Sequence, residues 1–91
     1  MRTRRLRIHG RVQGVYYRGW SVATARALGL RGWVRNRGDG SVEMLVAGSA
    51  AQVEAMIARC REGPPAARVD GVEVVEDEEE APAGFEARPT L

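Results

Sequence analysis

Alternation of apolar and polar residues near the N-terminus constrains this chain more than any other feature. Between residues 5 and 12, arginine or histidine alternates with an apolar residue or glycine. A period of two residues predicts a strand with one buried face, which we place at residues 4–12. Further strands are predicted at residues 31–37, 41–47 and 68–76. A sheet of such strands has one face against a core and the other toward solvent.

Two helices are predicted between these strands. The first spans residues 20–28, and Gly29 is placed to end it in a left-handed conformation. The second follows Ser49 and Gln52, whose spacing forms a capping box, and Gly63-Pro64-Pro65 should stop it. Its apolar stripe at helical spacing consists of Val53, Met56, Ile57 and Cys60.

The connections between these elements predict the topology. The tight turn Gly38-Asp39-Gly40 makes the strands on either side of it antiparallel neighbours. Because only one face of the sheet needs a cover, both helices should pack on that face. We therefore predict an α+β fold, a ferredoxin-like two-layer sandwich of order βαββαβ. Its antiparallel sheet should gain a short fifth strand at residues 85–88.

The composition bounds the size and the location of the protein. The chain has 91 residues, of which 44% are hydrophobic, so we expect a single domain over residues 1–91. No apolar run is long enough for a transmembrane helix, and no signal-peptide pattern follows the basic N-terminus. One cysteine excludes an internal disulfide. We expect a cytoplasmic protein with no membrane partner, and a monomer because no additional apolar stripe marks a partner surface.

The net charge of +2 conceals an uneven distribution. Residues 1–37 contain ten arginines and no acid, whereas residues 38–91 contain the other four arginines and all twelve acids. Two interpretations stay open: the basic half attracts an anion, or a basic first strand lies beside an acidic later strand and the charges screen each other. The absence of lysine excludes a Walker-type loop and Schiff-base chemistry.

The segment from Gly10 to Arg18, between the first strand and the first helix, has the features of an anion site. Gly14 permits a turn that residues with a Cβ resist, and backbone N–H groups at a helix N-terminus bind anions. Arg18, at the end of the segment, has a guanidinium suited to phosphate. We interpret the segment as a cradle for a phosphoryl group. The alternative is that Arg18 is only a surface charge.

Two separated motifs resemble the acylphosphatase family. The first is Gly10-x-Val12-Gln13-Gly14-Val15-x-Tyr17-Arg18. The second runs from Ala27-Leu28-Gly29-Leu30-x-Gly32-Trp33-Val34-x-Asn36 into Asp39-Gly40-Ser41-Val42-Glu43. The resemblance is almost continuous over residues 6–48, looser in the second helix and the fourth strand, and weak at residues 85–88. The family most often has Phe where this chain has Tyr17, and a tyrosine should pack there if its hydroxyl finds a partner.

The resemblance implies an enzyme that hydrolyses acyl phosphates to a carboxylate and inorganic phosphate, with no metal and no other cofactor. It assigns phosphate binding to Arg18 and to the backbone N–H groups of the loop, and it assigns orientation of the attacking water to Asn36. The loop consists of Gln13, Gly14, Val15, Tyr16, Tyr17 and Arg18. A cradle that binds the phosphate group should also accept inorganic phosphate or sulfate as a competing anion.

The remaining polar residues have simpler interpretations. Asn36 has the parity of Val34 in its strand, and without the resemblance it would be a turn former beside the hairpin. His9, the only histidine, is most simply an exposed strand residue. Cys60 is interpreted as packing rather than as a nucleophile, and one histidine with one cysteine does not make a zinc site. The acidic run at residues 77–80 is interpreted as solvated.

Two other function classes stay open. Ferredoxin-like sheets bind single-stranded RNA through aromatic residues on their open face, but the predicted first and third strands contain none, so we do not expect a nucleic-acid partner. We expect Trp20 and Trp33 to pack between the helices and the sheet. The other class is an anion-binding domain with a regulatory or carbamoyl-phosphate-handling role, as a similar domain has in the much larger hydrogenase maturation factors.

Overall fold

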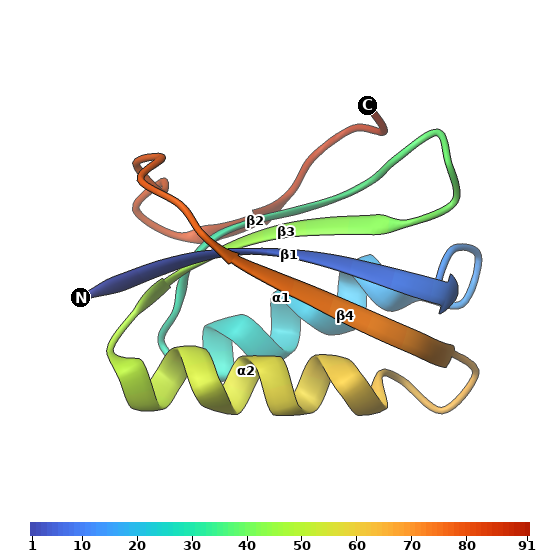
Figure 1. Ribbon diagram of the computed structural model, residues 1–91, viewed down its shortest axis with the longest axis horizontal. Coiled ribbons are helices and arrows are strands. Elements are labelled where there is room, and N and C mark those ends of the chain that lie inside the picture. Colours follow the sequence, from blue (N-terminus) through green and yellow to red (C-terminus); the bar gives the residue numbers. More distant parts are fainter.

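The computed structural model describes residues 1–91. The elements in chain order are β1 (Arg2–Arg11), α1 (Tyr17–Ala27), β2 (Arg31–Asn36), β3 (Val42–Gly48), α2 (Ala50–Glu62), β4 (Arg68–Glu76) and β5 (Phe85–Ala87). This order confirms the predicted ferredoxin-like α+β arrangement with a short fifth strand. Both helices cover the same face of one twisted sheet (Figure 1).

The strand order in the sheet is β4-β1-β3-β2-β5. The pairs β1–β3, β1–β4 and β2–β3 are antiparallel, as predicted. The prediction of an antiparallel sheet is wrong at one pair, because β5 runs parallel to β2. The reason is the path of residues 77–84, which cross one end of the sheet from β4 to the opposite edge. The chain therefore enters β5 from the end at which β2 begins.

Local signals in the sequence fix the ends of the helices. At α2, the Ser49 hydroxyl accepts a hydrogen bond from the Gln52 N–H at 3.2 Å, and the Gln52 side chain accepts one from the Ser49 N–H at 2.8 Å, which confirms the capping box. Gly29 follows α1 with a φ of 73°, as predicted. Helix α1 begins earlier than predicted, because Tyr16 has a φ of 67° and forms its N-cap. Arg18 therefore lies in the first turn of α1.

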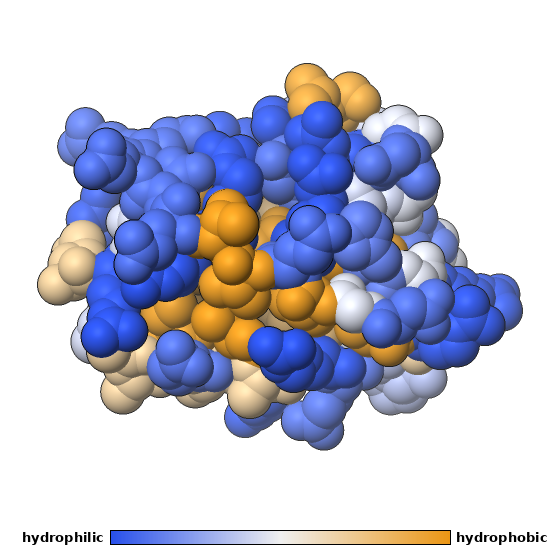
Figure 2. All heavy atoms as spheres, viewed as in Figure 1, coloured by the Kyte–Doolittle hydropathy of each residue, from blue (hydrophilic) through white to orange (hydrophobic).

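The main core lies between the helices and the sheet. It includes Leu6, Ile8, Val34, Met44 and Met56, each fully buried. Trp20 packs against this core, as expected. Hydrophobic residues also reach the surface of the molecule around β4 and α2 (Figure 2), where Val69, Val72 and Val74 are only partly buried. Neither helix has the length and the apolar composition needed to cross a membrane.

The face of the sheet opposite the helices, here called the open face, has a small core of its own. Trp33, Leu45, Ala47 and Ala81 form a second buried cluster. The expectation that Trp33 packs between the helices and the sheet is therefore wrong, because Trp33 alternates with Val34 and points the other way. The guanidiniums of Arg5, Arg35 and Arg88 cover its ring at 4.6–5.4 Å from the centroid, so Trp33 presents no aromatic platform for a base.

The acidic run after β4 folds over the open face instead of being merely solvated. Asp77 accepts a hydrogen bond from Arg5 Nε at 2.7 Å. Glu79 accepts one from Arg5 Nη2 at 2.7 Å and one from the Trp33 indole at 3.1 Å. Together with the ion pair between Arg4 and Glu76, these contacts support charge screening for much of the basic half of the chain.

Candidate active site

The segment between β1 and α1 is shaped by two apolar anchors and two left-handed residues. Val12 and Val15 are buried in the core, so their side chains hold the segment against the domain. Gly14 and Tyr16 have φ values of 75° and 67°. A left-handed backbone conformation causes no strain at Gly14, but it strains Tyr16. Strained residues of this kind are common at functional sites.

The backbone donors of this segment have no acceptors within the protein. None of the N–H groups from Gln13 to Gly19 donates a hydrogen bond to another protein group. Tyr16 supplies no side-chain cap to α1, and the first turn of the helix contains no acid. The partial positive charge of a helix N-terminus is therefore left for an anion from outside.

Most of the residues that carry these donors line a cavity of about 320 Å³. Most of segment 12–19 lines it, together with Asn36 at the end of β2 and Ala87 at the end of β5. The structure thus brings Gln13, Gly14, Tyr16, Tyr17 and Arg18 together with Asn36. Val15 is the one predicted loop residue that does not line the cavity, because its side chain belongs to the core.

Arg18 and Asn36 each contribute to this cavity a polar side chain that has no partner within the protein. Both are half-buried, and neither side chain makes a hydrogen bond or an ion pair with another residue. Arg18 comes from α1 and Asn36 from β2, so the fold itself places a guanidinium and an amide at one cavity. Such a pair can hold an anion and orient a small polar molecule beside it.

The Gln13 side chain connects the loop to the β2–β3 hairpin. Its amide Nε2 donates to the carbonyl oxygens of Arg37 at 2.8 Å and Ser41 at 2.9 Å. Asp39 closes the same hairpin by accepting from both the N–H and the hydroxyl of Ser41. The hydrogen bond from the Ser41 hydroxyl lowers the pKa of Asp39 below its usual value. Gln13 therefore fixes the loop relative to the segment that carries Asn36.

The side chain of Tyr17 anchors the first turn of α1 to the core and to α2. Its ring is buried and meets the Trp20 ring edge to face at 5.2 Å, while its hydroxyl donates to the Cys60 carbonyl at 2.7 Å. The predicted partner for this hydroxyl is thus present. Burial raises the pKa of Tyr17 and raises that of the Cys60 thiol to about 12. Cys60 is a core residue, as expected, and not an ionised nucleophile.

The sequence of the chain matches one family model over nearly its whole length. The model describes acylphosphatases and matches residues 4–87. The chain belongs to the acylphosphatase family. This assignment makes it a hydrolase of the carboxyl–phosphate anhydride bond, and it agrees with the two motifs from which the resemblance was inferred.

Individual acylphosphatases are similar over the full length. An acylphosphatase from Rhodospirillum rubrum is 55% identical over 91 residues, and the match covers all of both chains. The crystal structure of acylphosphatase from Bacillus subtilis aligns with a TM-score of 0.92 and 32% identity, over 97% of this chain and 99% of that one. Full-length HypF in its phosphate- and nucleotide-bound form aligns at 0.89 and 28% identity, over 98% of this chain but only 12% of HypF.

Some contributors to this acylphosphatase cavity were not predicted from the sequence. Ala87 joins it through the parallel pairing of β5 with β2, which local patterns do not indicate. Gly19 lines it as well, and a Cβ there would collide with the Tyr16 ring. The sequence pattern places Glu43 on its strand but does not connect it with the site. The hairpin turn could have indicated that connection, because its register pairs Glu43 with Arg35.

Proposed function

We propose that the chain hydrolyses acyl phosphates at the cavity between segment 12–19 and Asn36, and that it does so without a metal ion. One observation carries this proposal: the residues with backbone N–H groups that lack acceptors line, with the exception of Val15, the same cavity as the unpaired Arg18 guanidinium. Donors in this arrangement suit a group with several charged oxygens, and the phosphoryl end of the substrate is such a group.

In the proposed binding mode, Arg18 holds two phosphoryl oxygens through its forked N–H groups. The N–H groups of Gln13 to Gly19 hold the third oxygen and the negative charge that develops in the transition state. The N-terminus of α1 adds its dipole to this interaction. Because these donors are already in position, little reorganisation is needed when the charge appears.

The proposed reaction is an in-line displacement at phosphorus. Asn36 orients a water molecule, whose oxygen forms a bond to phosphorus while the bond from phosphorus to the acyl oxygen breaks. The carboxylate leaves with that electron pair, and both protons of the water end on the released dihydrogen phosphate. The phosphate group itself accepts the proton, so the amide of Asn36 serves as an orienting group and not as a base.

The remaining parts of the proposal concern the context of the enzyme. Residues 1–91 form a single domain that works as a monomer in the cytoplasm, and phosphate or sulfate competes with the substrate. Because the edge strand β4 has partly exposed valines, which are a possible contact surface for a second chain, sedimentation should test the monomeric state. HypF, which contains a similar domain, has been solved in a phosphate- and nucleotide-bound form.

The deciding experiment is hydrolysis of benzoyl phosphate in EDTA by the wild type, Arg18→Ala and Arg11→Ala. Arg11 is exposed and has no ion pair, and it precedes the cavity, so its removal controls for net charge. We expect Arg18→Ala to lose at least about 10²–10³-fold in kcat/KM and Arg11→Ala to lose little. Inactivity of the folded wild type, or equal losses in the two variants, would contradict the proposal.

A further inference from the structure

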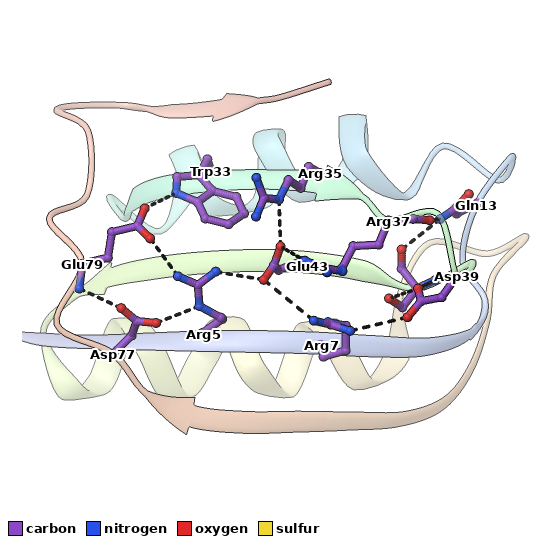
Figure 3. A network of polar contacts seen from close by, with 11 residues as sticks. Arg5, Arg7, Gln13, Trp33, Arg35, Arg37, Asp39, Glu43, Asp77 and Glu79 are labelled. Carbon is purple, nitrogen blue, oxygen red and sulfur yellow. Dashed lines mark hydrogen bonds and ion pairs between the residues drawn. The ribbon is translucent and has the colours of Figure 1, made fainter. Parts of the chain in front are cut away.

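Glu43 of β3 is almost completely buried on the open face, at 3% side-chain exposure. It is surrounded by four arginines, two from β1 and two from residues 35–37 (Figure 3). Arg5 from β1 donates to Glu43 Oε2 at 2.8 Å, and Arg7 lies 3.9 Å from the same oxygen. A carboxylate at this depth is stable only with several charged partners. The group is therefore fixed in place, whatever use the protein makes of it.

The other carboxylate oxygen of Glu43 joins two arginines that flank Asn36. Arg35 Nε donates to Oε1 at 2.7 Å, and Arg37 Nη1 donates to the same atom at 2.9 Å. Both side chains therefore lie on the open face. Asn36, between them in the sequence, lines the cavity on the opposite face, as the alternation of an extended strand requires. One carboxylate oxygen thus holds the backbone on both sides of Asn36.

Two further hydrogen bonds hold the same short segment. The carbonyl oxygen of Arg37 accepts from Gln13, and that of Asn36 accepts from the N–H of Leu91 at 3.1 Å. Neither contact restrains the end of the Asn36 side chain. Its direction depends on the backbone of residues 35–37. The β2–β3 ladder and the hydrogen bond from the Arg37 N–H to the Ser41 carbonyl hold this backbone, and the ion pairs of Arg35 and Arg37 with Glu43 add charged contacts.

We propose that Glu43 is a positioning residue for the Asn36 amide, acting through Arg35 and Arg37. The inference rests on the proposed function, in which Asn36 orients the attacking water. A misplacement of about 1 Å at such a group lowers turnover by as much as about 10²-fold. Glu43 does not touch the substrate, so its loss should affect kcat and leave phosphate binding at Arg18 unchanged.

The test compares Glu43→Met with Asp77→Asn. Methionine keeps the length of the side chain but has no carboxylate, whereas Asp77→Asn weakens a contact of Arg5 and leaves both arginine contacts of Oε1 intact. We expect Glu43→Met to lower kcat on benzoyl phosphate about 10- to 100-fold, with KM and inhibition by phosphate unchanged. Asp77→Asn should retain the wild-type kcat. Glu43→Gln, which keeps one acceptor oxygen, should recover part of the loss.

A double-mutant cycle separates positioning from general destabilisation. If Glu43 acts through Asn36, Glu43→Met should cause no further loss of kcat in an Asn36→Ala background. If Glu43→Met does not fold, Arg37→Met replaces it in the cycle, because Glu43 then keeps Arg5 and Arg35. Equal kcat values for Glu43→Met and Asp77→Asn, or additive losses in the cycle, would overturn the inference. An inactive wild type would instead overturn the proposed function.

Discussion

On the open face of the sheet, Arg5, Arg35 and Arg37 all contact carboxylates, whereas Arg18 at the cavity contacts none. The residues that supply these carboxylates all follow residue 37 in the sequence, and the fold brings them to the arginines of β1 and β2. No acid enters the first turn of α1. The two regions use the same residue type in opposite ways, to join strands in one case and to stay available to an anion in the other.

This difference explains how the basic half of the chain can be stable and can still bind an anion. The arginines that pair with carboxylates hold the sheet together, and those carboxylates neutralise their charge. The unpaired donors at the cavity are positioned by neighbours that do not occupy them, such as the Tyr17 hydroxyl and the Gln13 amide. Two kinds of experiment therefore test the comparison directly. One gives an unpaired group at the cavity a charged partner, and the other removes a partner from a group that is paired.

The strongest test places an acid in the cavity. Asn36→Asp keeps the shape of the side chain but adds a negative charge to the cavity that Arg18 lines. The new carboxylate should repel the phosphoryl group and attract the guanidinium, so we expect kcat/KM on benzoyl phosphate to fall at least about 10³-fold. Inhibition by phosphate should be lost with it.

Asn36→Ala is the matched control for this substitution. It removes the amide without adding charge, so it should lower kcat while phosphate still inhibits. If Asn36→Asp instead bound phosphate as well as Asn36→Ala does, the cavity would not be the anion site that we describe.

The second test removes the charge of a paired group by changing pH. Burial opposes ionisation of Glu43, but hydrogen bonds from Arg35, Arg5 and Arg37 outweigh it and lower its pKa from 4.5 to about 2. A carboxyl whose pKa is lowered by folding stabilises the protein above its unfolded pKa, and this stabilisation disappears as pH falls from about 4.5 to about 2. The expected loss is about 3 kcal/mol in the free energy of unfolding.

Urea denaturation at several pH values measures this loss, with Glu43→Gln as the control. The variant should be less stable than the wild type at neutral pH, and its stability should depend less on pH in this range. Identical pH dependence in the two proteins would show that Glu43 does not carry the effect. The lowered pKa values of Asp39 and Asp77 act in the same direction and should remain in both.

The third test releases the loop from the hairpin. Gln13→Ala removes both hydrogen bonds to the Arg37 and Ser41 carbonyl oxygens, which should lower the free energy of unfolding by about 2 kcal/mol. Because the loop backbone then moves relative to Asn36, we expect kcat/KM to fall about 10-fold. Gln52→Ala in the α2 capping box is a control of similar chemistry far from the cavity, and it should change stability without this loss of turnover.

Much of this arrangement could be predicted from local patterns, because the patterns concern residues that are close in sequence. The alternation in β1, the turn at Gly38-Asp39-Gly40 and the left-handed Gly29 each require only their neighbours. The glycine loop that ends at Arg18 indicated an anion site for the same reason. Local patterns do not distinguish a turn former from a site residue at Asn36, and only the resemblance to the family assigns it a role.

The parts that could not be predicted depend on contacts between distant segments. Part of the cover over Trp33 comes from Glu79 and Arg88, more than forty residues along the chain. The parallel strand β5 reaches its place only by crossing the sheet. The backbone donors of residues 13–19 lack acceptors, and this too is a property of the whole fold. A carboxylate from any segment nearby would have accepted their hydrogen bonds.

The smallest effect concerns the support beneath the cavity. The Tyr17 hydroxyl donates to the Cys60 carbonyl, one of the last carbonyl groups of α2, which have no partner within their own helix. Tyr17→Phe keeps the ring, its packing on Trp20 and the backbone N–H at the cavity, but it leaves this carbonyl without its donor. We expect the free energy of unfolding to fall by about 1 kcal/mol, measured by urea denaturation. An unchanged stability would mean that water replaces the hydroxyl at no cost, and the first turn of α1 would then depend on ring packing alone.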